Sequence, residues 1–476
     1  MLHVPALRAG RAYRSLHTAE LSDVRSGECV ARVSQANAGL IARDVAQAPA
    51  HRAALSRQPI AQRLAACRRA AERFAHGDVT LDEERRSVQS ADDYVAALSA
   101  TTGMPRSLCR ANAEKIRFVL AEMETVLAGL TRGLDLEALD RGWIETGGHV
   151  VSYRCRADAL GAVLPNNSPG VHSLWIPAVA LGVPVVLRPG RLEPWTPLRV
   201  ARALIEEGVP REAFCFYPSD YSGATQILMR CDRAMVFGDE STVRPWIGDE
   251  RVQVHGPGWS KVILGPDRAP DWDRHLDLIV DSIAANGGRS CLNASGVWTS
   301  SHGRELALAL ADRMASIEAR PLDDPQASLA AFPDARVARR ISDLIDSRLR
   351  TPGATDLTAA RRGSRIVERD GCTFLLPTVV WCDDPGHPLA RTELLFPFAS
   401  VVEARPEEIP DRIGPTLVAT VLSDDAAFRS RFLGCRSVDR LNLGPVPTLR
   451  IAWDQPHEGN LFEHLFQRRA LQAAAS

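Results

Sequence analysis

Residues 282–297 read SIAANGGRSCLNASGV, and this stretch predicts a helix that passes through a tight turn into a strand. The helix is expected to end at Asn286, where the glycine pair 287–288 allows a sharp reversal of the backbone. Cys291 follows at the edge of the next element, where a nucleophile would be accessible. The cation of Arg289 would lower the pKa of this thiol. We interpret Cys291 as a candidate nucleophile, although a generic cysteine is more often a buried structural residue.

A second segment, LPNNSP at residues 164–169, follows the predicted strand 161–164. An asparagine amide in such a loop can donate a hydrogen bond to an oxyanion that develops during a reaction. Asparagine and proline are also ordinary turn residues, so this loop alone identifies no chemistry.

Strands and helices alternate through most of the chain, which predicts parallel βαβ units and therefore an α/β fold. The predicted strands are 183–188, 213–217, 234–237, 261–265, 295–299, 378–382 and 398–403. Residues 30–130 are predicted to be helical, and a hairpin is expected within 136–158, where apolar residues alternate. We infer two α/β lobes, and a cleft between lobes is the expected ligand site.

The composition is that of a soluble globular enzyme. The chain has 476 residues, of which 45% are hydrophobic and 24% are charged. The net charge of −1 lacks the basic excess of a nucleic-acid-binding protein. Only Lys115 and Lys261 among the 57 basic residues are lysines, which indicates codon bias toward arginine rather than phosphate recognition. The longest apolar run, 175–187, is too short for a transmembrane helix, which needs about 20 residues.

Ten cysteines are spread along the chain without a Cys-x-x-Cys pair. This pattern predicts neither a zinc site nor a disulfide framework, so we expect no bound metal. Free thiols are typical of a reducing compartment, which predicts a cytoplasmic protein in which one thiol can be reactive.

Six segments together carry a resemblance to the aldehyde dehydrogenase superfamily, and they occur in the order of the family's motifs. They are PNNSP (165–169), PVVLRP (184–189), DRAMVFGDES (232–241), HGPGWSK (255–261), NGGRSC (286–291) and TELLFPF (392–398). Each departs from the family's usual motif, so the chain resembles a divergent member. The resemblance implies a Rossmann-like cofactor domain, an α/β catalytic domain and a small bridging hairpin. It also implies NAD or NADP as the cofactor.

The resemblance further implies a division of the chain into domains. Residues 1–135 and 159–254 would form the NAD(P)-binding domain, interrupted by a bridging and oligomerisation hairpin at 136–158. Residues 255–440 would form the catalytic domain, and the tail 441–476 would pack on the substrate or oligomer side. A homo-oligomer, dimer or tetramer, is expected. The tail lacks the family's Gly-Gly-x-Lys anchor loop, which puts the usual oligomerising strand in doubt.

Residue roles are implied where the motifs align. Cys291 matches the catalytic nucleophile, and Asn167 matches the amide that stabilises the oxyanion. Four positions match cofactor contacts: Glu393 at the nicotinamide ribose, Arg188 at the adenosine ribose, and Gly238 with Asp239 near the pyrophosphate. Asp239 replaces a serine, and its carboxylate would be unfavourable beside a phosphate unless it is turned away.

The largest departure is His255, which stands where hydrolytic members of the family have the glutamate that activates water. A neutral histidine can act as a general base near its ordinary pKa of about 6.5. Losing the carboxylate is also expected where a thiol such as CoA accepts the acyl group, and the sequence slightly favours this outcome. Glu458 in the tail could supply the base instead. His457 and Glu458 could also line the mouth of the substrate site, although a surface or structural role is more common for such residues.

The implied reaction is the oxidation of an aldehyde. The Cys291 thiolate attacks the carbonyl, and hydride transfer to the nicotinamide leaves a thioester. Two alternatives remain open. One is a CoA-dependent acylating aldehyde dehydrogenase or acyl-CoA reductase, and the other is a non-catalytic binding protein on the same fold. Retention of Cys291, Asn167 and Glu393 together speaks against the binding protein.

Overall fold

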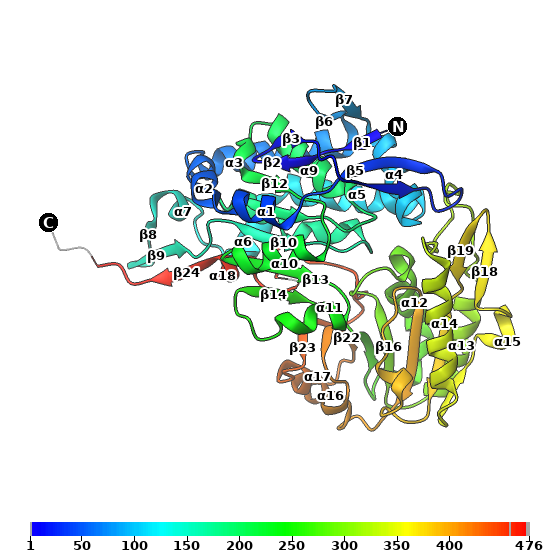
Figure 1. The fold of residues 1–476 in the computed structure, drawn as a ribbon. Helices are drawn as coiled ribbons and strands as arrows, with labels where there is room; N and C mark the ends of the chain where they lie inside the picture. Colours follow the sequence, from blue (N-terminus) through cyan, green and yellow to red (C-terminus); the bar gives the residue numbers. More distant parts are fainter. Residues whose placement is uncertain (1, 457, 473–476) are drawn as a thin grey trace.

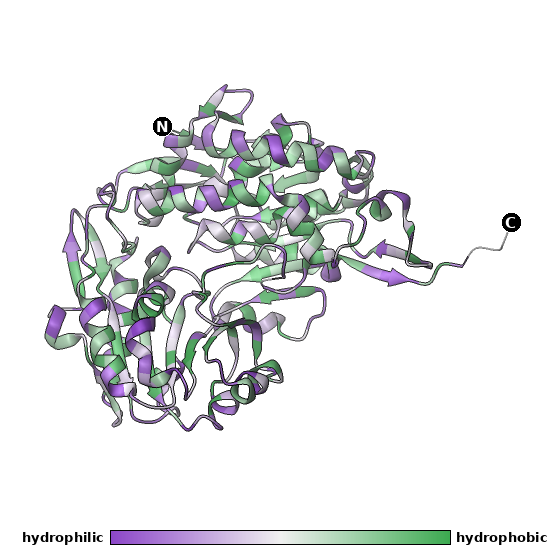
Figure 2. Ribbon diagram, turned by 180° about the vertical axis from the view of Figure 1, so that it is seen from behind, coloured by the Kyte–Doolittle hydropathy of each residue, from purple (hydrophilic) through white to green (hydrophobic). Residues whose placement is uncertain are grey.

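Two α/β lobes, each built on a seven-stranded sheet, make up the molecule, and a small antiparallel sheet projects from one side (Figure 1). The computed structural model describes residues 2–456 and 458–472. Most strands of the two large sheets are apolar and buried, and the helices around them carry polar residues (Figure 2). Such strands are typical of parallel sheets whose two faces are covered. The α/β class predicted from the sequence is confirmed.

The sheet of the first lobe has five parallel strands, with two antiparallel strands added at one edge. In spatial order the strands are β14 (Val252–His255), β13 (Arg233–Phe237), β10 (Leu160–Val163), β11 (Val185–Arg188), β12 (Phe214–Phe216), β2 (Ala6–Arg8) and β3 (Arg11–Tyr13). The chain runs outward from β10 in both directions, first through β11 and β12 and then through β13 and β14. Ligands of open α/β sheets bind outside the carboxyl ends of the strands at such a switch point.

The helices of this part of the chain are mostly amphipathic. They are α1 (Ala38–Val45), α2 (Ala48–Ser56), α3 (Ile60–His76), α4 (Ala91–Thr102), α5 (Arg106–Ala121), α6 (Met123–Thr131), α7 (Glu137–Arg141), α8 (Ile176–Ala180), α9 (Trp195–Glu206), α10 (Tyr221–Arg230), α11 (Glu240–Val243) and α18 (Leu461–Leu465). Pro59 separates α2 from α3, because proline cannot continue a helix without losing a hydrogen bond.

The prediction that residues 30–130 are helical is wrong at two places, where short strands occur. These strands are β5 (Cys29–Ser34), which pairs with β1 (Leu2–Val4) and β4 (Thr18–Ser22), and β6 (Val79–Asp82), which pairs with β7 (Ser87–Gln89). Strands of three to six residues are too short for the apolar period to distinguish them from the neighbouring helices.

The second lobe has six parallel strands and one antiparallel edge strand. In spatial order they are β17 (Ala354–Asp356), β20 (Thr378–Cys382), β21 (Phe398–Glu403), β16 (Ala294–Thr299), β15 (Ser260–Leu264), β22 (Thr416–Leu422) and β23 (Val438–Leu443). The helices of this lobe are α12 (Leu276–Ala284), α13 (Gly303–Ala315), α14 (Ala335–Leu349), α15 (Ala359–Arg362), α16 (Ile409–Arg412) and α17 (Ala426–Leu433), and a hairpin joins β18 (Ile366–Arg369) to β19 (Cys372–Leu375).

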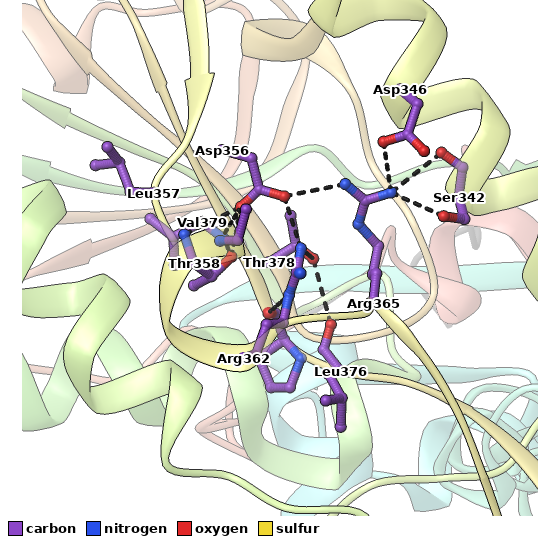
Figure 3. Close-up of polar contacts among 12 residues, drawn as sticks. Ser342, Asp346, Asp356, Leu357, Thr358, Arg362, Arg365, Leu376, Thr378 and Val379 are labelled. Atoms are coloured by element: carbon purple, nitrogen blue, oxygen red, sulfur yellow. Dashed lines mark hydrogen bonds and ion pairs between the residues drawn. The ribbon is translucent and has the colours of Figure 1, made fainter.

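A buried charge cluster joins α14 to the edge strand β17 (Figure 3). Asp356, the last residue of β17, accepts hydrogen bonds from Arg362 at 2.6 Å and from Arg365 at 3.0 Å. Arg365 also donates to Ser342 at 2.8 Å and to Asp346 at 2.9 Å, both on α14. One carboxylate therefore holds two cations whose side chains are almost fully covered.

The projecting sheet consists of β8 (Trp143–Thr146), β9 (His149–Cys155) and β24 (Phe466–Arg469), with β9 in the centre (Figure 1). β24 comes from the C-terminal tail and pairs antiparallel with β9, Phe466 opposite Cys155. The tail therefore supplies a third strand although it lacks the anchor-loop motif, and a role of this strand in oligomerisation stays a prediction. Within the described residues, no helix is long and apolar enough to cross a membrane.

Candidate active site

Cys291 lies on the turn between α12 and β16. Asn286, Gly287 and Gly288 at the start of the turn have positive φ angles of 56°, 66° and 67°. Glycine is also required at 288 for packing, because a Cβ there would lie 2.4 Å from the backbone of Phe396. The tight turn predicted from the Gly-Gly pair is present, and it fixes the backbone that carries Cys291.

The loop that follows β14 packs directly on this turn. A Cβ at Gly258 would lie 2.1 Å from the carbonyl oxygen of Cys291, so the close approach requires glycine. Ser260 Oγ donates to the same carbonyl oxygen at 2.9 Å. The carboxyl end of the first lobe's sheet and the cysteine turn of the second lobe therefore meet at this point.

Glu458, from the C-terminal tail, contacts both Cys291 and His255. The Sγ atom of Cys291 lies 3.8 Å from Oε1 of Glu458, and Nδ1 of His255 lies 3.4 Å from Oε2. The side chains of His255 and Glu458 are each only 7% exposed. The ring of Phe237 stacks on the imidazole with centroids 4.3 Å apart. Nε2 of His255 is buried, and no described residue hydrogen-bonds to it.

The surroundings of Cys291 disfavour its thiolate when no ligand is bound. Burial raises the pKa of the Cys291 thiol well above its usual range, and the carboxylates of Glu458 and Glu393 raise it further. The ammonium of Lys115 opposes these effects. A base next to the sulfur is therefore needed to make Cys291 nucleophilic.

Arg289 does not face the thiol. Its guanidinium donates to the carbonyl of Ala331 and lies 4.8 Å from the ring centroid of Phe332. The prediction that Arg289 lowers the pKa of Cys291 is therefore wrong, because the turn directs this side chain away from the sulfur and into the protein.

Asn167 reaches the cysteine turn from the loop after β10. Its Nδ2 donates to the carbonyl of Arg289 at 2.9 Å. An amide nitrogen carries two N–H groups, so one remains for another acceptor. The structure brings Asn167 to the turn that bears Cys291, and its role as an oxyanion donor stays a prediction.

Glu393 faces the loop at residues 258–259. Its carboxylate accepts the backbone N–H of Trp259, and burial raises the pKa of Glu393 to about 7. Lys261 lies near this carboxylate, and burial lowers the pKa of its ammonium to about 7. Nζ of Lys261 donates to the carbonyl of Trp259 at 2.6 Å and to Oγ1 of Thr416 at 2.9 Å. The ribose contact of Glu393 stays a prediction.

Arg188 ends β11 at the carboxyl edge of the first sheet. Its guanidinium donates to the carbonyl of Ser219 at 3.2 and 3.0 Å. The Ser219 hydroxyl is buried, and no partner for it occurs among the described residues. An arginine and an unpaired hydroxyl at this edge are suited to a polar ligand such as a ribose.

Gly238 and Asp239 lie between β13 and α11. The carboxylate of Asp239 accepts hydrogen bonds at 2.8 Å from the Thr242 N–H and from the Ser241 hydroxyl. These bonds, that from Ser241 above all, lower the pKa of Asp239. Asp239 therefore turns onto its own helix, where its carboxylate occupies the backbone N–H of Thr242.

A pocket of about 310 Å³ opens beside the Cys291–Glu458 contact. Its lining residues are Ala111, Asn112, Lys115, Ser168, Gly170, Val171, Ser173, Asn286, Ser290, Leu292, Leu449, Ile451, Trp453 and Glu458. Sequence reasoning missed Lys115 as a pocket residue, although its rarity in an arginine-rich chain was a signal. His457 lies outside the described residues.

Comparisons with known proteins identify the family of this chain. The family model of the aldehyde dehydrogenase family matches residues 13–409. The chain belongs to the aldehyde dehydrogenase family, as the resemblance predicted.

The chain is similar to several members of this family. A putative succinate-semialdehyde dehydrogenase [NADP(+)] of Mycolicibacterium smegmatis is 24% identical over 51% of this chain and 47% of the relative. An alpha-ketoglutarate semialdehyde dehydrogenase of Haloferax volcanii is 23% identical over 65% of this chain and 66% of the relative. The match thus spans about half the length of the first relative.

Solved structures share the fold over nearly the whole chain. The indole-3-acetaldehyde dehydrogenase AldA of P. syringae, determined in complex with NAD+ and IAA, has a TM-score of 0.80 at 18% identity and covers 98% of this chain and 96% of its own. The aldehyde dehydrogenase KauB of Pseudomonas aeruginosa has a TM-score of 0.78 at 18% identity and covers 99% and 96%. The predicted aldehyde dehydrogenase fold is therefore confirmed.

Proposed function

We propose that this chain oxidises an aldehyde with NAD or NADP through a thioester on Cys291, in the cytoplasm. The observation that carries the proposal is the contact of Cys291 with Glu458 and of Glu458 with His255, where Glu458 lines a pocket large enough for a small aldehyde. A non-catalytic binding protein has no need of a carboxylate against a buried thiol.

In this proposal Glu458 accepts the proton of the Cys291 thiol as the sulfur attacks the carbonyl carbon. The carboxylate already lies 3.8 Å from the sulfur, and the raised pKa of the Cys291 thiol makes such a base necessary. The free N–H of the Asn167 amide then stabilises the oxyanion.

The residues at the carboxyl edge of the first sheet are suited to bind the adenosine end of a dinucleotide. Arg188 and the unpaired hydroxyl of Ser219 would hold the adenosine ribose, and Glu393 would hold the nicotinamide ribose. A bound nicotinamide would supply the hydride acceptor. Gly238 would lie near the pyrophosphate, but the N–H of Thr242 at the start of α11 is already used by the carboxylate of Asp239.

Resolution of the thioester is proposed to use His255. Once Glu458 has released the proton of the Cys291 thiol to solvent, its carboxylate would hold Nδ1–H of the imidazole, which leaves Nε2 to take a proton from water as the water oxygen attacks the thioester carbon. The C–S bond then breaks, the carboxylic acid leaves, and the imidazolium returns its proton to the sulfur. This pairing of an imidazole with a carboxylate follows the logic of a catalytic triad. It favours hydrolysis over the thiol acceptor that the loss of the glutamate suggested.

The test is turnover of butyraldehyde with NAD or NADP, with and without CoA, in wild type, Cys291→Ala, His255→Ala and Glu458→Gln. We expect acid release without CoA, no turnover in Cys291→Ala, and a burst of reduced cofactor followed by slow turnover in His255→Ala. A strict need for CoA would reject hydrolysis in favour of the acylating enzyme. Full activity in Cys291→Ala would reject the thioester mechanism altogether.

A further inference from the structure

Lys115 presents its ammonium to the pocket beside Cys291, and no hydrogen bond or ion pair to it occurs among the residues that the structure describes. The residue lies on α5 and lines the pocket. Within the described part of the chain, Nζ makes no hydrogen bond, and no carboxylate oxygen lies within 4.0 Å of it. The ammonium lies over the ring of Trp453, 5.8 Å from Nζ to the centroid. A poorly solvated ammonium without hydrogen bonds is costly, so its retention needs a reason.

Lys261, the other lysine of the chain, has a structural role and can be compared with Lys115. Lys261 is 3% exposed, and its Nζ donates to the carbonyls of Trp259 and Pro415 and to the hydroxyl of Thr416. Its three donors are used within the protein. Lys115 has the same chemistry, but its donors point to space that a ligand can fill.

The polar side chains that line the pocket next to Lys115 form hydrogen bonds with one another. Asn112 donates to Asn286 at 2.7 Å, Asn286 donates to Ser168 at 3.0 Å, and Ser168 donates to Asn112 at 3.1 Å. This closed triangle leaves few donors for a ligand. Gly170 leaves space next to the ammonium, because a Cβ at this position would lie only 3.2 Å from Nζ of Lys115. The ammonium is therefore the strongest donor that this part of the pocket offers.

The carboxylate of Glu458 also lines the pocket, but it is engaged at the reacting end. It contacts the sulfur of Cys291 and the imidazole of His255. Among the described residues, its oxygens form no ion pair with Nζ of Lys115. The charge of Glu458 acts on Lys115 without a direct ion pair between the two described side chains, so the N–H donors of the ammonium stay available to a second anion. Leu449 and Ile451 supply an apolar wall for a short carbon chain.

We propose that Lys115 binds the anionic group of the substrate, and that the substrate is a short aldehyde with a carboxylate at its other end. This inference rests on the proposed function, because it concerns the same pocket. The aldehyde carbon would lie at Cys291, the methylene chain along the apolar wall, and the carboxylate on the ammonium of Lys115. A hydrogen bond between charged groups in such a site corresponds to about a 10- to 100-fold preference.

The experiment compares succinic semialdehyde with butyraldehyde, which has the same number of carbons but no charge. The ratio of their kcat/KM values is measured in wild type, Lys115→Met, Lys115→Arg and Arg117→Met. Arg117 is the matched control, because it lies on the same helix and pairs with Glu114 and Glu72 at the surface. We expect wild type to favour the acidic aldehyde at least tenfold, and Lys115→Met to lower the ratio about 10- to 100-fold through KM. Lys115→Arg should restore part of the preference, and Arg117→Met should keep the wild-type ratio.

A second readout needs no turnover. Succinate should slow the alkylation of Cys291 by iodoacetamide in wild type and in Arg117→Met, whereas butyrate should protect less, and Lys115→Met should lose the difference. If no aldehyde is oxidised but succinate still protects, the proposed function fails and the anion site stands. Equal kcat/KM for the two aldehydes in wild type, or an equal loss on both in Lys115→Met, would overturn the assignment of Lys115.

Discussion

At the scale of single residues, Asn167 has one amide N–H committed to the carbonyl of Arg289 and one available. Asn167→Ala should therefore lower kcat about 10²- to 10³-fold, because an oxyanion donor acts in the transition state. The dissociation constant of NAD, measured by fluorescence titration, should stay within about twofold. A variant that lost cofactor affinity and kept kcat would place this loop in the cofactor site instead.

Glu393 carries a pH dependence that can be measured without substrate. Burial raises the pKa of its carboxyl from an ordinary value of 4.5 to about 7. Between these values the folded state holds a proton that the unfolded state has lost, so wild-type stability falls as pH rises. Glu393→Gln removes this titration, and it also removes an attraction to nearby Lys261, which needs an ionised carboxylate and a protonated ammonium and is therefore largest near pH 7. The Tm of Glu393→Gln minus that of wild type should increase from pH 5 to pH 8. A difference that is constant or decreases with pH would contradict the buried carboxyl.

The sequence allowed prediction of residues within ordered motifs but not of contacts made by the tail. Cys291 and His255 belong to motifs with recognisable spacing, and the structure places both on the same cluster. Glu458 reaches this cluster from a segment that lacks the family's pattern, so only tertiary packing reveals its position. Arg289 was misjudged because proximity in sequence does not determine the direction of a side chain on a tight turn.

At the scale of elements, the long parallel strands were predictable because they are continuous apolar runs between turns. The strands β10, β11, β13, β16, β20 and β21 were all expected within two residues of their observed bounds. The short strands β5, β6 and β7 were missed, since pairing partners distant in sequence stabilise them and local periodicity does not. Strand β24 was doubted because its pairing with β9 depends on backbone hydrogen bonds, which almost any tail sequence can make.

The edge strand β17 depends on the charge cluster around Asp356. Asp356→Ala leaves the cations of Arg362 and Arg365 buried without their shared carboxylate, which should destabilise the protein by about 3–5 kcal/mol. Glu137→Ala, which removes an exposed helix pair with Arg141, is the control and should cost about 0.5 kcal/mol or less. Urea unfolding followed by tryptophan fluorescence measures both. Similar values for the two variants would show that the cluster contributes no more than a surface ion pair.

At the scale of the whole molecule, the projecting sheet extends away from both lobes (Figure 1). A sheet of three short strands buries little apolar surface by itself, and such sheets are stable when they pack against another surface. Trp143 and Val150 are 48% and 44% exposed on it. They share one face, because Trp143 pairs with Ser152 and Glu145 pairs with Val150 in neighbouring cross-strand positions. This face is suited to a second copy of the chain, which agrees with the homo-oligomer expected from the resemblance.

Val150→Glu should therefore convert an oligomer into monomers in sedimentation velocity measurements, because a second carboxylate opposite Glu145 would be buried in the interface without a cationic partner. Leu433→Glu is the control: Leu433 is 69% exposed on the second lobe, so the same kind of substitution should leave the sedimentation coefficient unchanged. The Tm of Val150→Glu should become independent of protein concentration, whereas that of wild type should rise with it, since association stabilises the folded state by mass action. A monomeric wild type, or an oligomer that persists in Val150→Glu, would show that this sheet face does not mediate assembly.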